Sequence, residues 1–335
     1  MTPRPEGEGR TRVVAGIDEA GLGPLLGPLT LGYAALRVPL GAQTLWERLA
    51  DAVSEDPRAG GEKLVVCDSK RVFSRTQTGR ARLETTALGF AAVARGETPA
   101  SGGALLESGP QRLRPAASEL ERHPWYAHLP PRLPMWTDPG RLELRAERLR
   151  RAAVRSGVEV VACAARVVPV GELNRSWRRT KNKNSTVWAH VAAILRELWE
   201  AHGAEGLSVV VDRQGGRSHY AAGLLRAFPE ADFRALAETP VCSVYRLAAD
   251  RPRRSMLVWF CERGEERSLP TALASCAAKY AREVCMGAFN RYFEGLQPGL
   301  RPTAGYTSDG RRWMRDAAGA LEAAGLPREV LVRER

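Results

Sequence analysis

The sequence predicts an α/β protein, and two observations carry that prediction. Short apolar runs rich in Val and Ile, of strand length, are separated from longer stretches in which apolar residues recur at helical spacing. With 44% hydrophobic residues in 335, the chain can also bury a sizeable core. Neither observation alone decides between one large domain and two small ones.

Four strands are expected in the first half of the chain. Arg12 to Asp18 is the first, and after a turn rich in glycine and proline, Leu29 to Val38 follows closely enough to pair with it antiparallel. Leu64 to Cys67 is a short apolar run, and Val158 to Val168 is a longer strand candidate.

The second half predicts helices around two further strands. Apolar residues at helical spacing predict a helix over Thr186 to His202. The run Leu207 to Val211 comes next and ends at Asp212, as expected for a strand buried on both faces. Another strand is expected over Val241 to Leu247, and long helices over Pro270 to Phe293 and Arg311 to Ala324.

The amino-acid composition changes between about residues 85 and 145, and we interpret this stretch as an insertion in a single domain covering 1–335. Glu97 to Leu113 is rich in Gly, Ser and Pro, as a mobile segment would be. His123 to Pro139 mixes five prolines with Trp125, Tyr126 and Trp136. We expect a compact irregular piece whose aromatic side chains pack on the main domain.

Composition limits the compartment and the partners. No apolar stretch approaches the ~20 residues that span a bilayer, and Met1 to Arg12 lacks a signal-peptide core, so we expect a cytoplasmic protein. The six cysteines form no Cys-x-x-Cys pair and are expected to be reduced, and the histidines show no zinc spacing. The net charge of +12 favours phosphate-bearing partners, although the scarcity of lysine indicates that Arg simply replaces Lys throughout.

Acidic residues follow two of the predicted strands. Asp18 and Glu19 end the first, and Asp212 ends a strand almost two hundred residues later. If these strands are neighbours, the carboxylates converge, and such a cluster repels itself unless cations neutralise it. Carboxylates suit Mg²⁺, and two such ions could catalyse phosphodiester hydrolysis. The alternative is that Asp212 only begins the turn Arg213-Gln214-Gly215-Gly216.

Four segments resemble, in order along the chain, the motifs of the type 2 ribonucleases H (the ribonuclease HII family). They are Gly16-Ile17-Asp18-Glu19-Ala20-Gly21, Asp68-Ser69-Lys70, the stretch from Ala274 to Glu283, and Gly305-Tyr306-Thr307-Ser308-Asp309. The resemblance implies a ribonuclease H-like fold, with a mixed five-stranded sheet flanked by helices and further helices at the C-terminus.

The resemblance also implies an activity and a site. The expected protein is a monomeric endonuclease that uses Mg²⁺ or Mn²⁺ to cleave the RNA strand of RNA/DNA hybrids, or ribonucleotides embedded in duplex DNA. Two-metal hydrolysis would leave 3′-hydroxyl and 5′-phosphate ends. The implied metal ligands and catalytic residues are Asp18, Glu19, Asp212 and Glu265, and the implied substrate-binding residues are Gly21, Leu22, Gly23, Lys70, Lys279 and Tyr306.

Two positions depart from the family pattern. The family usually has Asp where an ungapped count reaches Glu265, and Glu262, Glu266 and Glu283 are competitors for the role. The family turn Gly-Arg-Gly is Gly21-Leu22-Gly23 here. Two alternatives therefore stay open: a nuclease of the same fold that acts on branched or single-stranded nucleic acid, and a catalytically silent nucleic-acid-binding module.

Overall fold

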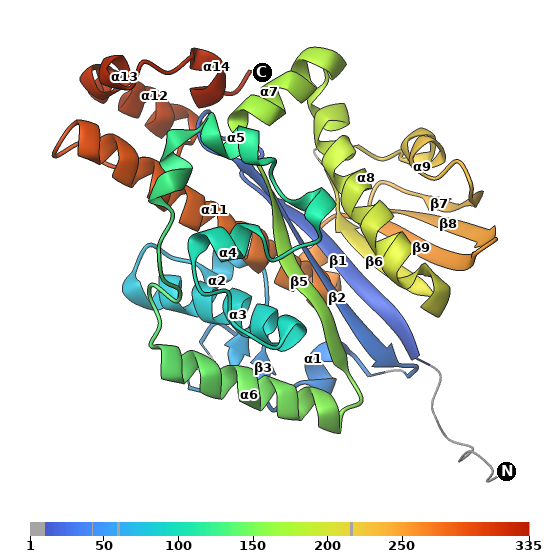
Figure 1. Cartoon of the computed structure of the whole chain (residues 1–335). Coiled ribbons are helices and arrows are strands. Elements are labelled where there is room, and N and C mark those ends of the chain that lie inside the picture. The colour runs from blue at the N-terminus through green and yellow to red at the C-terminus, as the bar shows by residue number, and fades with distance from the viewer. Residues whose placement is uncertain (1–10, 42, 59–60, 215–216, 335) are drawn as a thin grey trace, which may run out of the picture.

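The computed structural model describes residues 11–41, 43–58, 61–214 and 217–334. Its centre is a mixed sheet in which β1 lies between β2 and β6 (Figure 1). β1 and β2 pair antiparallel, whereas β1, β6 and β9 run parallel to one another. The strands, in spatial order, are β5 (Glu159–Val168), β2 (Leu29–Pro39), β1 (Thr11–Ala20), β6 (Leu207–Asp212), β9 (Arg253–Cys261), β8 (Cys242–Asp250) and β7 (Asp232–Glu238).

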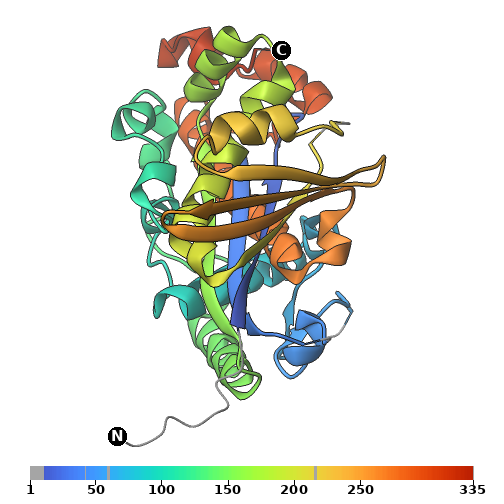
Figure 2. The same ribbon diagram turned by 90° about the vertical axis from the view of Figure 1, so that its right-hand side faces the viewer.

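The α/β class and the mixed sheet are confirmed, but among the described residues the sheet has seven strands instead of the expected five. The two strands missing from the sequence prediction are β7 and β9. β7 is exposed along most of its length and shows no apolar run. β9 does contain an apolar run, residues 256–261, but it follows Arg253, Arg254 and Ser255 and was not recognised as a strand. Figure 2 shows β7 and β8 crossing in front of β1, because the sheet is strongly twisted.

Alternating residues of β1 and β2 face two different helical layers. One set, including Val13, Ile17 and Leu31, packs with α8 (Lys183–His202) in the largest core cluster. The other set, including Leu36 and Val38, packs with α11 (Leu269–Leu296), α3 (Gln77–Arg95) and α6 (Pro139–Arg155). The part of the sheet around β1 and β2 is therefore covered by helices on both faces (Figure 1).

Two glycines let α11 lie directly on the sheet. A Cβ atom on Gly32 would come within 1.9 Å of the Ala274 carbonyl oxygen, and one on Gly16 within 2.1 Å of the Thr271 amide nitrogen. Only glycine fits such an approach. The contact brings Ser275 of α11 to the end of β1.

Residues 85–145 carry more regular structure than their composition indicates. Thr85 to Arg95 form the second half of α3, and α6 begins at Pro139. Between them lie α4 (Gly102–Leu106), η1 (Gln111–Leu113), α5 (Ala117–Glu121) and η2 (Pro124–His128). The expected packing of aromatic side chains is confirmed, since the buried Trp125 contacts Phe289 of α11 with ring centroids 5.1 Å apart.

The remaining elements are short. The helix expected over 311–324 is two helices, α12 (Thr307–Asp316) and α13 (Ala318–Ala324), which are broken at Ala317. The others are α1 (Leu45–Arg48), β3 (Val53–Ser54), β4 (Leu64–Val65), α2 (Ser69–Val72), α7 (Val170–Thr180), η3 (Gly203–Glu205), α9 (Ala221–Ala227), α10 (Gly264–Arg267) and α14 (Arg328–Leu331).

The structure corrects the expectation that all six cysteines are reduced. Cys242 and Cys261 are not reduced thiols but form a disulfide, because the pairing of β8 with β9 sets them directly opposite each other. The N-terminal segment 1–10 and Gly215–Gly216 of the expected turn lie outside the described residues. None of the helices in the described ranges is long and apolar enough to cross a membrane.

Candidate active site

The parallel strands bring the predicted carboxylates to one edge of the sheet. Ile17 pairs with Val211, so Asp18 and Asp212 follow at the same level of neighbouring strands. Asp212 in turn pairs with Cys261, the last residue of β9, and Glu265 lies four residues further on in α10. Residues that are far apart in the sequence therefore meet because three strands end together.

Two of the carboxylates are held in place by hydrogen bonds from the backbone and from Ser275. An Asp18 carboxylate oxygen accepts a hydrogen bond from the Glu19 amide at 2.7 Å, and the Ser275 side chain also bonds to Asp18. An Asp212 oxygen accepts from the Gly264 amide at 2.9 Å. Arg263, with φ of 53°, turns the chain through the left-handed region just before Gly264. The loop after β9 is thereby fixed against the end of β6.

The cluster carries more negative charge than its surroundings compensate. Burial, and then the neighbouring Asp212, raise the pKa of Asp18 to about 7. Burial together with Asp18 and Asp212 raises the pKa of Glu19 well above its ordinary value. Burial also raises the pKa values of Asp212 and Glu265, and the two side chains share a hydrogen bond. Asp212 makes ionisation of Asp18, Glu19 and Glu265 less favourable, whereas the hydrogen bond from Glu265 favours ionisation of Asp212.

The structure distinguishes Glu265 from its three competitors. Glu262 is 60% exposed and pairs with Arg213, with 3.3 Å between nitrogen and oxygen. Glu266 pairs with Arg263 at 3.7 Å. Glu283 pairs with Lys279 at 2.7 Å. Of these four glutamates, only Glu265 hydrogen-bonds to Asp212 and raises the pKa of Asp18.

The two lysines of the predicted substrate site lie in different surroundings. Lys70 is exposed and close enough to lower the pKa values of Glu19 and Asp212. Lys279 instead pairs with Glu283 and lies 4.4 Å from the centroid of the Phe73 ring. Only Lys70 is positioned to influence the carboxylate edge directly.

The glycine turn and Tyr306 lie on either side of a buried arginine. Gly21 has φ of +83°, and a Cβ atom there would meet the Arg282 side chain at 2.2 Å. The guanidinium of Arg282, which is 1% exposed, lies 5.5 Å from the centroid of the Tyr306 ring. Tyr306 itself is 48% exposed and could stack on a sugar or base.

The middle of the glycine turn is apolar and faces a pocket. Leu22 packs against the largest core cluster. Together with Gly23 and Trp177 it also lines a cavity of about 200 Å³. The turn therefore presents backbone and an apolar wall where the family pattern has an arginine.

Several polar groups at the site were not assigned from the sequence. Ser275 bonds to Asp18 and donates to the Ser69 hydroxyl at 2.9 Å, and Asp68 lies close enough to raise the pKa of Glu265. All three belong to the motif segments Asp68-Ser69-Lys70 and Ala274 to Glu283, so the signal was present in those segments. The Gly264 amide had no such signal, since only the turn after β9 aims it at Asp212.

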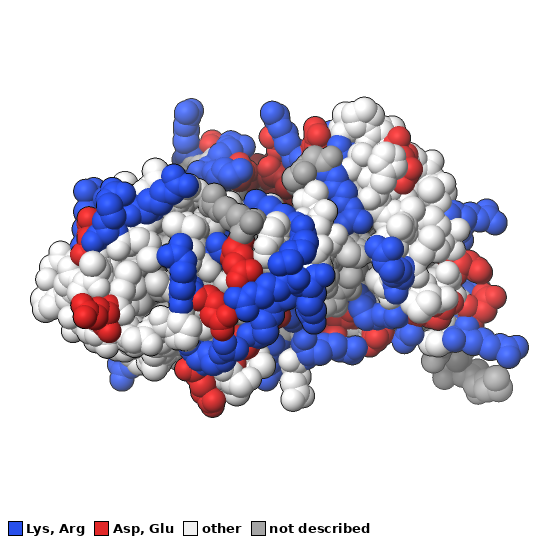
Figure 3. Space-filling model, turned by 90° about the horizontal axis from the view of Figure 1, so that it is seen from above, with Lys and Arg blue, Asp and Glu red and all other residues white. Residues whose placement is uncertain are grey.

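The donor set at this edge fits divalent cations. Asp18, Glu19, Asp212 and Glu265 offer carboxylate oxygens, the ligands that Mg²⁺ and Mn²⁺ prefer. Across the described ranges, no three His, Cys, Asp or Glu side chains are grouped closely enough to hold one ion between them. A cation bound here would oppose the burial and the acid–acid repulsion that raise the pKa values of Asp18 and Glu19. Figure 3, which looks down on the end toward which β1 runs, shows Lys and Arg side chains around smaller groups of acidic ones.

Comparison with known proteins gives a consistent but distant likeness. No protein-family model and no curated protein matches the sequence. Among solved structures, the chain is similar to ribonuclease HII from Archaeoglobus fulgidus, solved as a complex with PCNA, at 16% identity and a TM-score of 0.41, covering 96% of this chain and 94% of that one. It is similar to ribonuclease H2 from Pyrococcus horikoshii OT3 at 12% identity and a TM-score of 0.40, with 95% of this chain and 92% of that one covered. It is also similar to Bst-RNase HIII in complex with Mn²⁺ at 14% identity and a TM-score of 0.38, with 97% of this chain and 67% of that one covered.

Proposed function

We propose that the protein is a divalent-metal-dependent endoribonuclease that cleaves the RNA strand of RNA/DNA hybrids or ribonucleotides embedded in duplex DNA. One observation supports this above the others: Asp18, Asp212 and Glu265 lie together where β1, β6 and β9 end, burial raises the pKa values of all three, and Asp212 further raises those of Asp18 and Glu265. The order of the four motif segments along the chain supports the same assignment.

The carboxylates would hold the ions. Asp18, Glu19, Asp212 and Glu265 are the proposed ligands, and the hydrogen bond between Asp212 and Glu265 shows that these two side chains lie close together. When bound, the ions would polarise the phosphodiester and lower the pKa of the attacking water. Ser275 and the Gly264 amide keep Asp18 and Asp212 in place, so little reorganisation is needed on binding.

Other residues would recognise the substrate. Lys70, exposed beside the carboxylates, would contact a phosphate. The turn Gly21-Leu22-Gly23 allows a sugar to approach the backbone closely, and the exposed ring of Tyr306 would stack beneath it. The 2′-hydroxyl would distinguish RNA from DNA at that point. Because Leu22 supplies no charge, we propose cleavage of longer RNA stretches more readily than of single ribonucleotides.

Cleavage of three labelled duplexes, in Mg²⁺ and in Mn²⁺, tests the proposal. One is an RNA/DNA hybrid, one carries a single ribonucleotide in DNA, and one is all DNA. We expect cutting of the first two only, and its loss in Asp212→Asn. Glu262→Gln is the matched control, since Glu262 is exposed and paired with Arg213.

Three results would overturn the assignment. Full activity in Asp212→Asn would remove the carboxylates from the reaction. Cutting of branched or single-stranded DNA, but of neither RNA-containing duplex, would indicate a different substrate on the same fold. Metal-independent binding without cleavage of any substrate would indicate a silent binding module.

A further inference from the structure

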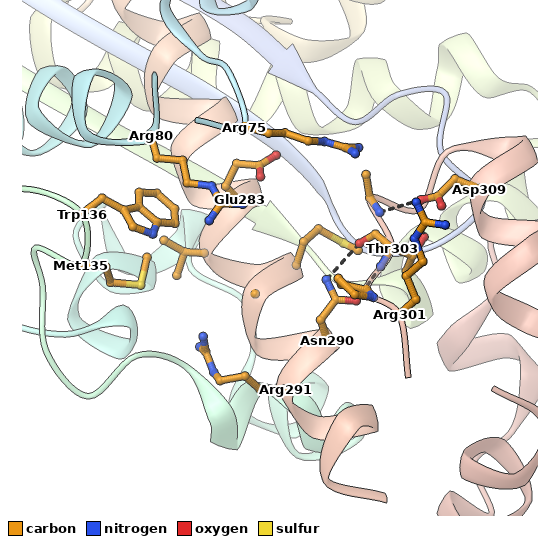
Figure 4. Close-up of a pocket in the computed structure, with 15 residues that line it drawn as sticks. Arg75, Arg80, Met135, Trp136, Glu283, Asn290, Arg291, Arg301, Thr303 and Asp309 are labelled. Atoms are coloured by element: carbon orange, nitrogen blue, oxygen red, sulfur yellow. Dashed lines mark hydrogen bonds between the residues drawn. The ribbon is translucent and has the colours of Figure 1, made fainter. Parts of the chain in front are cut away.

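A second concentration of charge lies beside the C-terminal half of α11. Four arginines from three parts of the chain line a cavity of about 320 Å³, shown in Figure 4. We call it the arginine cavity, after Arg75, Arg80, Arg291 and Arg301. Met135, Trp136 and Met286 contribute apolar surface to its wall.

The positive charge of the arginine cavity is not cancelled by the protein. Within the described ranges, none of its four arginines forms an ion pair, whereas Arg178 on α7 pairs with both Glu329 and Glu334. The two acids that line the cavity are already neutralised elsewhere: Glu283 by Lys279 at 2.7 Å, and Asp309 by Arg312 at 2.8 Å. An anionic ligand would therefore meet uncompensated guanidinium groups.

The wall of the cavity is held rigidly. The fully buried carboxylate of Glu84 on α3 accepts hydrogen bonds from the amides of Met135, Trp136 and Thr137 at 2.6–2.8 Å. The Tyr280 hydroxyl donates to the same carboxylate at 3.0 Å. Three consecutive amides are thereby fastened to α3 and α11, and Trp136 is held as a platform for the Arg80 guanidinium, 5.8 Å from the ring centroid.

Positive charge continues on the other side of Trp136. This residue also lines a second cavity, of about 370 Å³, with four more basic residues: Lys63, Arg82, Arg141 and Arg145. In the part of the chain that the structure describes, none of these four is in an ion pair either; Arg145 donates to the Gly61 carbonyl oxygen. The two cavities form a basic track across the start of α3.

We propose that the arginine cavity and this track bind the sugar–phosphate backbone of a duplex beyond the point of cleavage. Arg is suited to phosphate because its planar guanidinium donates in two directions. Glu283 to Arg291 lie 8 to 16 residues after Ser275 on α11, which at 1.5 Å per residue is about 12–24 Å from the carboxylate edge. At 3.4 Å per base pair, the contact would fall roughly four to seven base pairs away. The inference rests on the proposed function for its substrate.

Binding without cleavage tests the inference. The affinity of the chain for a hybrid of about 24 base pairs would be measured by fluorescence anisotropy, with a chelator present, between about 50 and 200 mM salt. Each phosphate contact contributes about 0.9 to the slope of log affinity against log salt. For Arg75→Gln/Arg301→Gln we expect that slope to fall by about 2, and for Arg75→Lys/Arg301→Lys we expect most of it to remain.

The control is a second arginine pair with the same charge. Arg234 and Arg246 are exposed, lie opposite each other on β7 and β8, and line neither cavity. Arg234→Gln/Arg246→Gln should leave the slope unchanged. Equal losses in the two glutamine pairs, or no loss in Arg75→Gln/Arg301→Gln, would overturn the inference.

Failure of the inference and failure of the proposed function are separable. A chain that cleaves hybrids but keeps its salt slope in Arg75→Gln/Arg301→Gln overturns the backbone contact alone. A chain that cuts no RNA-containing duplex but loses slope only in that pair supports the contact and overturns the nuclease.

Discussion

Two buried acidic regions of this molecule are treated in opposite ways. Glu84 is fully buried, yet three backbone amides and the Tyr280 hydroxyl donate to its carboxylate. At the sheet edge, Asp18 is also buried and Glu19 is half-buried, but their nearest charged neighbours are mostly other acids, and their pKa values rise. The protein satisfies the first site with its own donors, whereas the proposed function assigns cations to the second.

The largest effect is expected from a substitution at the carboxylate edge that contains Asp18 and Glu19. Asp18→Asn should reduce cleavage of the hybrid about a thousandfold or more, since bound ions contribute several kcal/mol and each 1.36 kcal/mol is tenfold. In metal-free buffer the same variant should be as stable as the wild type or more so, because one repelling charge is gone. Metal-free urea unfolding of both proteins checks this, and a clear loss of stability would contradict the comparison.

A substitution of Glu84, whose carboxylate accepts hydrogen bonds from three amides, should lower the stability of the fold. Glu84→Leu leaves the amides of residues 135–137 without their hydrogen-bond acceptor. A buried donor without an acceptor destabilises the folded state by about 1–3 kcal/mol. We expect the free energy of unfolding to fall by about 3 kcal/mol, allowing for partial hydration. A fall in the free energy of unfolding of less than about 1 kcal/mol would show that the hydrogen bonds to Glu84 do not hold the segment around Trp136 in place.

His190 is a buried base whose charged form is disfavoured, as the charged forms of Asp18 and Glu19 are. Burial, and then Arg166 and Arg179, lower its pKa to about 3, while the nearby Glu172 is bound by Arg166. Because the unfolded chain binds this proton first, the folded state loses stability as the pH falls from about 6.5 toward 3. By pH 5 the loss is about 2 kcal/mol.

Removing the imidazole should remove that pH dependence. The stability of His190→Asn should fall less between pH 7 and 5, by about 2 kcal/mol, than that of the wild type. Urea unfolding at both pH values measures the difference. Parallel pH profiles would indicate that His190 is protonated in the folded state.

The smallest effect is expected at an acid that lies outside both regions. Glu262 is only three residues from Glu265, but it is 60% exposed and paired with Arg213. Glu262→Gln should change the free energy of unfolding by less than about 1 kcal/mol, as for surface ion pairs. Its cleavage rate should stay within about twofold of the wild type. A rate loss comparable to that of Asp18→Asn would transfer the fourth carboxylate from Glu265 to Glu262.

Much of the fold could be predicted because local patterns specify it. The strand expected over Val158 to Val168 is β5 to within one residue, and the helix expected over Thr186 to His202 is α8 extended by one turn. The meeting of Asp18 with Asp212 was also expected, because both follow apolar strands. The placement of carboxylates at strand ends needs no knowledge of long-range contacts.

Other features had no local signal. β7 is largely exposed and lacks a buried apolar face, and Cys242 and Cys261 meet only through the register of β8 with β9. The three amides that Glu84 binds lie more than fifty residues away, so nothing around Glu84 in the sequence indicates a buried carboxylate.

By itself, the sequence determined most of the long helices and strands, the acids at two strand ends and the motif segments that indicate a ribonuclease H-like site. Only the tertiary structure decided which glutamate joins Asp212, because the turn at Arg263 and Gly264 after β9 directs Glu265 inward and leaves Glu262 and Glu266 on the surface. It also decided which arginines stay unpaired around Trp136. Both outcomes depend on how distant segments pack, since the charge around a side chain comes from all the elements that contact it.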